Sequence, residues 1–154
     1  MGYDLDSIEA AESEFLQGAI QQATLLMRAR GGAFYICDPV LAQFEVAATH
    51  GLATILWGEE LISQVCESRQ AATAIYPGSC AVLAVPSIWR DTVHGVLVVA
   101  DDAVERTFNS QDTALLESLA ELAAAAMQQA RRLTRMTAQF RAMHIIDVAL
   151  TSSL

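Results

Sequence analysis

The three cysteines, Cys37, Cys66 and Cys80, are the strongest candidate nucleophiles in the sequence. Their odd number and the lack of any CxxC spacing favour neither a disulfide framework nor a thiolate zinc site. Cys66 would be a redox or nitrosylation sensor if its surroundings stabilised the thiolate. The charged neighbours of Cys66 in the sequence are acidic, namely Glu59, Glu60 and Glu67. Because negative charges raise the pKa of a thiol, we expect an inert Cys66 and three structural thiols.

The histidines do not form a metal-ligand pattern. His50 precedes Gly51 and His94 precedes Gly95, which favours turn and strand-start positions over metal or haem ligation. The sequence leaves His50 open as an axial haem ligand. His144 lacks the His-Glu pair of a kinase phosphoacceptor, and an exposed pairing with a carboxylate three residues later explains it. No serine, cysteine or carboxylate group has the spacing of a catalytic site, so we expect neither an enzyme nor a metal site in this segment.

The bulk composition predicts one acidic, folded domain. The chain has 154 residues, 53% of them hydrophobic, and a net charge of −9 with arginine as its only cationic residue. Phosphate backbones and anionic lipids would repel such a surface, so we expect no nucleic-acid partner and no membrane contact. The first residues are acidic, without the basic start and apolar block of a secretory signal. We therefore expect a cytoplasmic protein.

These candidate groups must be positioned by helices and strands whose signals alternate along the chain. Residues 1–30 predict a long helix, ended by Gly31-Gly32. Residues 33–37 and 44–49 predict two short strands joined as a hairpin. Helical spacing returns over 54–68, and a third strand is expected from Ala72 onward.

The second half of the chain predicts a buried hairpin and then one long helix. Residues 80–86 and 95–100 are apolar strands in the sheet centre, with a polar turn over 87–93. Asn109 and Asp112 resemble a capping box, and neither Gly nor Pro occurs from 110 to 154. A helix of about 40 residues is about 60 Å long, which exceeds the diameter of such a domain.

The final helix carries a heptad seam, with residues alternating three and four apart. Because its far end extends beyond the domain, we expect a homodimer in which the first and last helices form the interface. The seam residues assigned to that interface are Leu119, Leu122, Ala126, Gln129, Leu133, Met136, Phe140 and Met143.

Three stretches together resemble the pattern of GAF domains, the small sensory modules of phosphodiesterases, phytochromes and histidine kinases. They are Gly78–Pro86, which ends in Val-Pro, the Gly-Val-Leu strand Gly95–Ala100, and Phe108–Asp112 at the start of the closing helix. The resemblance covers about residues 25–132. It implies an α+β fold, GAF-like (PAS-like), with an antiparallel sheet of five or six strands, helices on both faces, and long N- and C-terminal helices.

The resemblance divides the chain into three overlapping parts. Residues 1–30 would be an incoming signalling helix, 25–132 the GAF domain, and 110–154 a long outgoing helix. Residues 145–154 resemble the start of a further sensory domain's helix, so we expect a downstream domain of the same polypeptide as a partner.

The resemblance also implies a ligand pocket on the sheet face opposite the terminal helices. Cyclic nucleotides are disfavoured, because residues 101–106 lack the Asn-Lys-x-x-x-Phe-Asp signature and the chain has no lysine. Bilins are disfavoured because no Cys-His pair precedes the Gly-Ser strand, and the cofactor is otherwise unknown. From strand alternation the expected lining residues are Phe34, Ile36, Val46, Ala48, Leu56, Trp57, Leu61, Val65, Tyr76, Cys80, Val82 and Ala84.

The function implied by the resemblance is that of a regulatory sensor in a multidomain bacterial signal-transduction protein, most often a sensor histidine kinase. A change in the pocket would shift the terminal helices and bias a two-state coiled coil. Two alternatives remain open: a ligand-free dimerisation and linker module, and a small enzyme like the free methionine sulfoxide reductases of the same fold. Those reductases need paired reactive cysteines in pocket loops, whereas the cysteines here fall in or near predicted regular elements.

Overall fold

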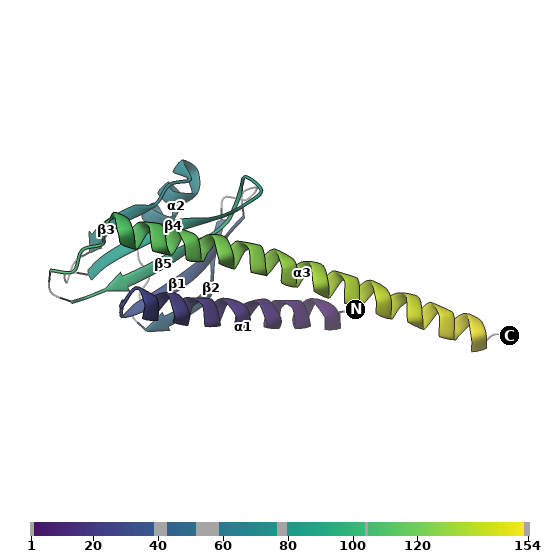
Figure 1. Cartoon of the computed structure of the whole chain (residues 1–154). Helices are drawn as coiled ribbons and strands as arrows, with labels where there is room; N and C mark the ends of the chain where they lie inside the picture. The colour runs from purple at the N-terminus through teal and green to yellow at the C-terminus, as the bar shows by residue number, and fades with distance from the viewer. Residues whose placement is uncertain (1, 39–42, 52–58, 77–79, 104, 153–154) are drawn as a thin grey trace.

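A computed structural model describes residues 2–38, 43–51, 59–76, 80–103 and 105–152, with the backbone alone for 2–12, 134 and 144–152. Its described strands form one antiparallel sheet in the order β2-β1-β5-β4-β3 (Figure 1). The strands are β1 (Gly31–Asp38), β2 (Gln43–Gly51), β3 (Ala72–Tyr76), β4 (Cys80–Trp89) and β5 (Thr92–Asp101). The α+β antiparallel fold expected from the sequence is confirmed, with five strands in the described part.

The centre of the sheet is apolar on both faces because both faces are covered. Val96–Ala100 of β5 and Ala81–Val85 of β4 are buried without alternation. Their continuous apolar runs predict a central antiparallel pair. In the structure β4 pairs with β5 from Ala81 to Trp89.

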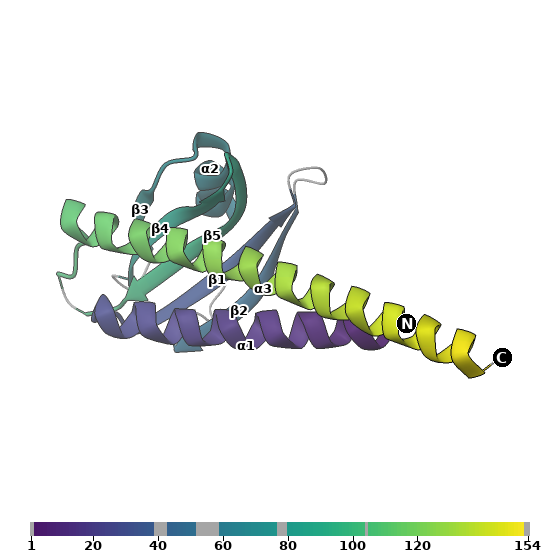
Figure 2. The same cartoon turned by 45° about the vertical axis from the view of Figure 1, so that its right-hand side comes forward.

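Two long helices cover one face, which we call the helix face. Helix α1 (Gly2–Leu26) and helix α3 (Ser110–Ser152) lie side by side and run in opposite directions, so that both chain ends lie at the same end of the molecule (Figures 1 and 2). A buried stripe at helical spacing joins α1 and the residue after it to the sheet, formed by Leu16, Ile20, Ala23 and Met27. Helix α3 contributes Leu116, Ala120, Ala123, Ala124 and Met127.

Helix α2 (Glu59–Ser68) covers the opposite face, which we call the α2 face. Its buried side chains Leu61, Ile62 and Val65 contact one cluster of strand residues. That cluster contains Ala33, Tyr35, Val82, Ala84, Val96, Val98 and Ala100. The sheet is therefore the middle of three layers.

The ends of two elements differ from the sequence prediction. Helix α1 ends at Leu26 rather than at residue 30, with Arg28 in the left-handed region at φ 54°, so Gly31 and Gly32 begin β1 instead of ending the helix. The polar turn expected over 87–93 is only Arg90 and Asp91, at φ 49° and 64°. Two consecutive positive φ values give the turn whose twist matches the flanking strands. Ser87 belongs to β4, where it pairs with Gly95 of β5, and its buried hydroxyl donates to the Ala120 carbonyl, 2.9 Å away.

The reciprocal cap expected at the start of α3 is confirmed. The Asn109 backbone N–H donates to Oδ2 of Asp112 at 2.9 Å, and the Asp112 N–H donates to Oδ1 of Asn109 at 2.9 Å. This cap fixes where α3 begins, and therefore which of its side chains meet the sheet.

Candidate functional site

A cavity of about 370 Å³ lies on the α2 face, where the end of β1, the β4–β5 turn and α2 meet. Its described lining combines thiols, an aromatic ring and charged groups of both signs. The residues are Cys37, Asp38, Phe44, Ser63, Cys66, Glu67, Arg69, Asp91, Thr92 and Val93. Other hollows of the described residues lie outside α2 and between the β4–β5 turn and α3, and neither contains a thiol.

Two thiols meet in this cavity. The Sγ atoms of Cys37, near the end of β1, and Cys66, on α2, are 2.7 Å apart, and both residues are half-buried. Strand alternation directs Cys37 to the α2 face together with Ala33 and Tyr35, and Cys66 follows Val65 on the sheet-facing side of α2. Two elements distant in sequence thus bring one thiol each to the same wall.

The contact shifts the pKa values of the two thiols in opposite directions. The hydrogen-bond contact with Cys37, in which either sulfur can donate, lowers the pKa of Cys66, although burial and the Glu67 carboxylate oppose this shift. The pKa of Cys37 is raised by the same hydrogen bond, by burial and by the charge of Cys66. The expectation that acidic neighbours dominate at Cys66 is therefore wrong: Glu67 acts in the expected direction, but the unforeseen Cys37 thiol outweighs it.

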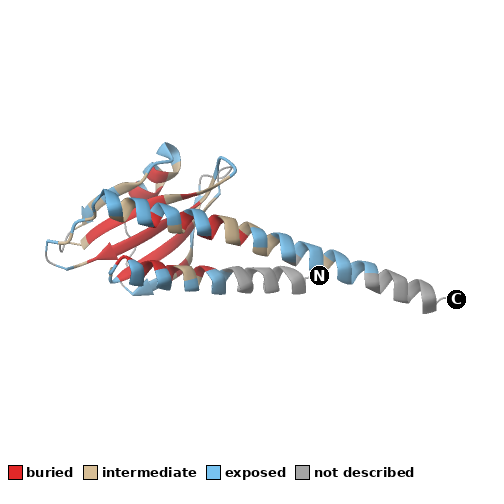
Figure 3. Cartoon of the chain, viewed as in Figure 1, coloured by how far each residue is buried: buried red, intermediate tan, exposed pale blue. Residues whose placement is uncertain are grey.

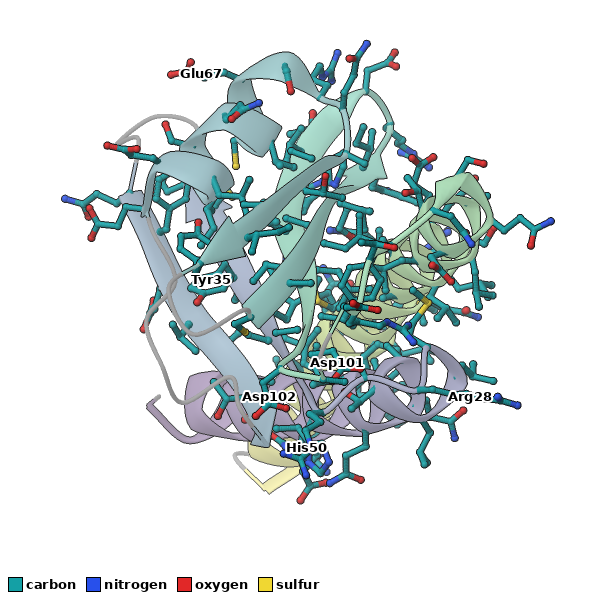
Figure 4. All side chains as sticks on the ribbon, turned by 90° about the vertical axis from the view of Figure 1, so that its left-hand side faces the viewer. Arg28, Tyr35, His50, Glu67, Asp101 and Asp102 are labelled. Atoms are coloured by element: carbon teal, nitrogen blue, oxygen red, sulfur yellow. The ribbon has the colours of Figure 1, made fainter. Side chains whose placement is uncertain are left out.

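Cys80 lies apart from this pair. It begins β4, and burial together with Asp102 and Asp101 raises the pKa of its thiol. Figure 4 shows these two aspartates beside the end of α1, while Tyr35 lies on the sheet beneath α2 and Glu67 points outward from α2. The two ends of the sheet therefore carry different thiol environments.

The pocket predicted from alternation falls partly on the wrong face. Phe34, Ile36 and Ala48 belong to the cluster under α1 and α3, not to the α2 face. A β-bulge in the β1–β2 pairing explains the error for β2, since Phe34 pairs with Ala48 but Tyr35 pairs with Val46. Val46 consequently shares the Tyr35 face, where it is 39% exposed.

The other predicted pocket residues divide into two groups. The α2 face does hold Leu61, Val65, Tyr76, Cys80, Val82 and Ala84. Leu61, Val65, Val82 and Ala84 are buried in the core there and do not line the cavity. Leu56 and Trp57 lie outside the described residues.

The cavity-lining residues were missed because no local pattern marks them. Asp91, Thr92 and Val93 reach the cavity through the tight β4–β5 turn, and Arg69 lies just past the end of α2 at φ 59°. The one available signal was the prominence of Cys66 on a helix crossing the sheet.

The predicted seam residues of α3 differ in exposure along the helix. Leu119 packs partly against the helix-face core and Ala126 is half-buried, whereas Gln129 is exposed. Figure 3 shows that the described distal part of α3 is exposed on the outside of the molecule. The exposed apolar seam residues are Leu122 at 67%, Leu133 at 58%, Met136 at 57%, Phe140 at 72% and Met143 at 66%.

A charged cluster ties the end of α1 to the segment after β5. Arg106 donates from Nη2 to the Met27 carbonyl at 2.9 Å and lies over the Phe108 ring, while its Nε is 3.8 Å from Asp101 Oδ2. Arg30 pairs with Asp102 at 3.2 Å. These contacts cap α1 with a cation, which a helix C-terminus favours.

The described part of the chain offers neither a metal site nor a membrane-spanning helix. There, no group of three or more histidine, cysteine and acidic side chains could hold a metal ion. The same residues include no helix that is both long and apolar enough to cross a bilayer.

Solved structures with this fold come from several kinds of protein. The second GAF domain of DevS from Mycobacterium smegmatis matches at TM-score 0.68 and 21% identity, over 81% of this chain and 99% of that one. The GAF domain of an Acinetobacter phosphoenolpyruvate-protein phosphotransferase matches at TM-score 0.63 and 18% identity, over 86% and 98%. A type II free methionine-R-sulfoxide reductase from Thermoplasma acidophilum matches at TM-score 0.63 and 16% identity, over 79% and 96%.

At these identities the structural matches establish the fold alone. No curated protein matches the sequence. The sequence itself matches the family described as GAF domain over residues 12–129, which spans the second part of α1, the whole sheet, α2 and the sheet-packed part of α3. The chain therefore belongs to the GAF domain family.

Proposed function

We propose that this GAF domain is a regulatory sensor module in a multidomain bacterial signal-transduction protein, with a sensor histidine kinase as the output, working in the cytoplasm. The observation that carries the proposal is the α1–α3 layer. Both helices pack on one sheet face, and α3 continues past the domain with Leu133, Met136, Phe140 and Met143 57–72% exposed. A helix with that exposed apolar face suits a connection between domains better than an isolated globule.

The proposed signal passes through the sheet. Neighbouring residues of β4 alternate between the two layers, with Val82 contacting the α2 cluster and Leu83 contacting the cluster under α1 and α3. Ser87 adds a direct hydrogen bond from β4 to α3. A change in the cavity would shift the strands against α1 and α3 and thereby bias two arrangements of the helices.

The proposed assembly is a parallel homodimer through the α3 seam and α1. Full burial of a large apolar side chain contributes about 1.5–3 kcal/mol, so several exposed seam residues favour pairing strongly. Parallel pairing delivers both copies of a downstream domain to the same end. Gln129 in the seam weakens the packing locally, which suits a helix that changes register.

The ligand of the proposed sensor is a small molecule other than a cyclic nucleotide or a bilin. The sequence lacks the signatures of both classes, as described above. Mass spectrometry of the purified domain and thermal denaturation with candidate molecules separate a sensor from a ligand-free linker. Retention of a molecule, or a rise in Tm with one, supports the sensor, whereas neither effect across a broad set supports the linker.

Output measurements on the full-length protein test the proposed relay. We expect Phe140→Glu, in the seam, to change autophosphorylation by about tenfold or more, since coupling energies of 1–3 kcal/mol are typical. Ala142→Glu introduces the same charge at an exposed position off the seam. Equal activities of wild type and both variants would exclude α3 as the relay, and absence of autophosphorylation would exclude the kinase output.

One observation favours a second candidate, a reductase of free methionine sulfoxide. The argument against that activity was that the cysteines fall in or near regular elements rather than in pocket loops. Cys37 and Cys66 do lie in β1 and α2, but their sulfur atoms are in contact beside a cavity. Incubation with free methionine sulfoxide and dithiothreitol tests it. Methionine formation that disappears in Cys66→Ser would establish the enzyme, and no turnover above a protein-free blank would exclude it.

A further inference from the structure

The Cys37–Cys66 contact joins two elements that are far apart in the sequence. The two residues are 29 positions apart, one near the end of β1 and the other on α2, with their sulfur atoms 2.7 Å apart. A disulfide requires two sulfurs at about 2.0 Å with the Cβ atoms about 3.5–4.5 Å apart. The thiols therefore need only a small local movement to become covalently joined.

Small oxidants can reach the pair through the cavity. Both cysteines are half-buried and line its wall, with Ser63 and Thr92 offering hydroxyl groups nearby. A volume of about 370 Å³ admits a hydroperoxide without displacement of the core residues Val65 and Val82. A thiol pair facing such a space differs from a pair of structural thiols enclosed by apolar side chains.

The two thiols have unequal roles. Either sulfur can donate in the contact, and the pKa of Cys66 is lowered by it, which favours the nucleophilic thiolate form at Cys66. The pKa of Cys37 is raised by the same contact, which favours Cys37 as the thiol that reacts second. Cys66 is therefore the group that attacks an oxidant, and Cys37 is placed to resolve the product.

We propose that Cys37 and Cys66 form a hydroperoxide-oxidisable dithiol site that closes to an intramolecular disulfide between β1 and α2. In the first step the Cys66 sulfur attacks one peroxide oxygen, the O–O bond breaks, and the leaving oxygen takes a proton and departs as an alcohol or water. In the second step the Cys37 sulfur attacks the Cys66 sulfenic acid, the S–O bond breaks, and water leaves with the Cys37 proton. The two sulfurs lose two electrons and the peroxide gains them.

This site does not depend on the proposed sensor function, because the chemistry requires only the two thiols and the oxidant. Its consequence for the structure is local: the disulfide fastens α2 to the sheet at the cavity. A thiol reductant restores the two free thiols.

Cys80 provides an internal control within the same chain. Ile36, next to Cys37, pairs with Gly95 of β5, whereas Ala81, next to Cys80, pairs with Asp101. At about 3.3 Å per residue the two positions are about 20 Å apart along β5. Cys80 therefore cannot exchange with the pair in the folded protein.

The test is oxidation of the reduced protein with a small excess of hydrogen peroxide, followed by thiol counting after denaturation and by peptide mapping. We expect the wild type to fall from its three free cysteines to a single one, with a Cys37–Cys66 cross-link that dithiothreitol removes. Cys80→Ser should form the same cross-link at the same rate. Cys37→Ser should stop at a Cys66 sulfenic acid that dimedone captures, and Cys66→Ser should form no Cys37 cross-link.

Three outcomes would overturn the proposal: all thiols survive in the wild type, the cross-link contains Cys80, or Cys66→Ser oxidises as fast as the wild type. Circular dichroism of each variant establishes that it is folded. The rate of thiol labelling provides a second test, which does not require a cross-link to form. We expect Cys66 to react with iodoacetamide about tenfold or more faster than Cys80, since thiolate fraction sets the rate, and equal rates would also contradict the proposal.

Discussion

The aromatic ring of Phe34 occupies the space that a side chain at Gly95 would need. A Cβ atom at position 95 would lie 2.5 Å from Cε1 and Cζ of that ring and 2.6 Å from the backbone oxygen of Tyr35. Phe34 is 1% exposed and contacts the helix-face core, so neither the ring nor the backbone can move freely. The glycine of the Gly-Val-Leu strand thus positions the aromatic residue of the neighbouring strand.

Gly95→Ala is expected to lower the free energy of unfolding by about 1–3 kcal/mol, the usual cost of overpacking a core. Denaturant unfolding monitored by circular dichroism measures it. Gly18→Ala is the matched control, because nothing lies within 4 Å of a Cβ there and alanine favours an exposed helix position. A Gly95→Ala protein as stable as the wild type would show that Phe34 moves aside.

Ser87→Ala is expected to lower the free energy of unfolding by about 1 kcal/mol, because the buried Ala120 carbonyl loses the hydroxyl that donates to it at 2.9 Å. Ser118→Ala is the control, since its hydroxyl donates to the Ala114 carbonyl on the exposed side of the same helix. Thermal unfolding of both variants gives the comparison. A larger loss at Ser118 than at Ser87 would contradict the assigned role in joining β4 to α3.

Replacement of Leu122 and Leu133 by Glu is expected to convert a dimer to a monomer at micromolar concentration. Both leucines are more than half exposed in the single chain and lie on the proposed seam, where a buried carboxylate opposes pairing. Sedimentation equilibrium measures the mass, and circular dichroism should show an unchanged sheet. Ala142→Glu should remain dimeric. A monomeric wild type, or a dimeric double variant, would show that the proposed interface is wrong.

The free energy of unfolding is expected to fall in mild acid through His94. The pKa of His94 lies below its ordinary value of 6.5 because of burial, with Arg131 adding to the shift and a backbone hydrogen bond to Trp89 opposing it. In the unfolded chain His94 therefore binds a proton near pH 6.5. In the folded domain it binds that proton only at a lower pH. Stability is full above that pH and is lost as pH falls from there towards the lower folded value.

His94→Gln should weaken this loss, and unfolding curves measured between about pH 7.5 and 5.5 test it. His50→Gln controls for the removal of an imidazole, since His50 is exposed at the surface. Equal acid sensitivity of wild type and His94→Gln would assign the effect to other groups.

The fold was predictable because its signals are local. The apolar runs of the two central strands, the helical spacing of α2 and the Asn109–Asp112 cap each lie within a few residues, and each appears where the sequence placed it. Three of the strand pairings join neighbours in the sequence, whereas the β1–β5 pairing that completes the sheet is a crossover that no local signal predicts.

Local signals could not predict which face of the sheet each residue occupies, or where the Cys37–Cys66 pair and its cavity lie. Strand alternation cannot reveal the bulge that separates Ala48 from Val46, so the predicted pocket mixed the two faces. In α1 the buried stripe includes Leu16 and Ile20, whereas Leu25 and Leu26 are exposed although they are equally apolar. The Cys37–Cys66 contact depends on tertiary structure alone, because no spacing rule relates residues 29 apart.

Strand β1 connects the two layers that flank the sheet. It pairs with β2 over Gly31–Asp38 and with β5 over Gly31–Ile36, which restrains both of its edges. Its first residue follows the segment after α1, and Cys37 near its other end touches α2. At about 3.3 Å per residue, strand β1 is about 25 Å long. We therefore expect a displacement of Cys37 by α2 to be transmitted along β1 to the segment that follows α1.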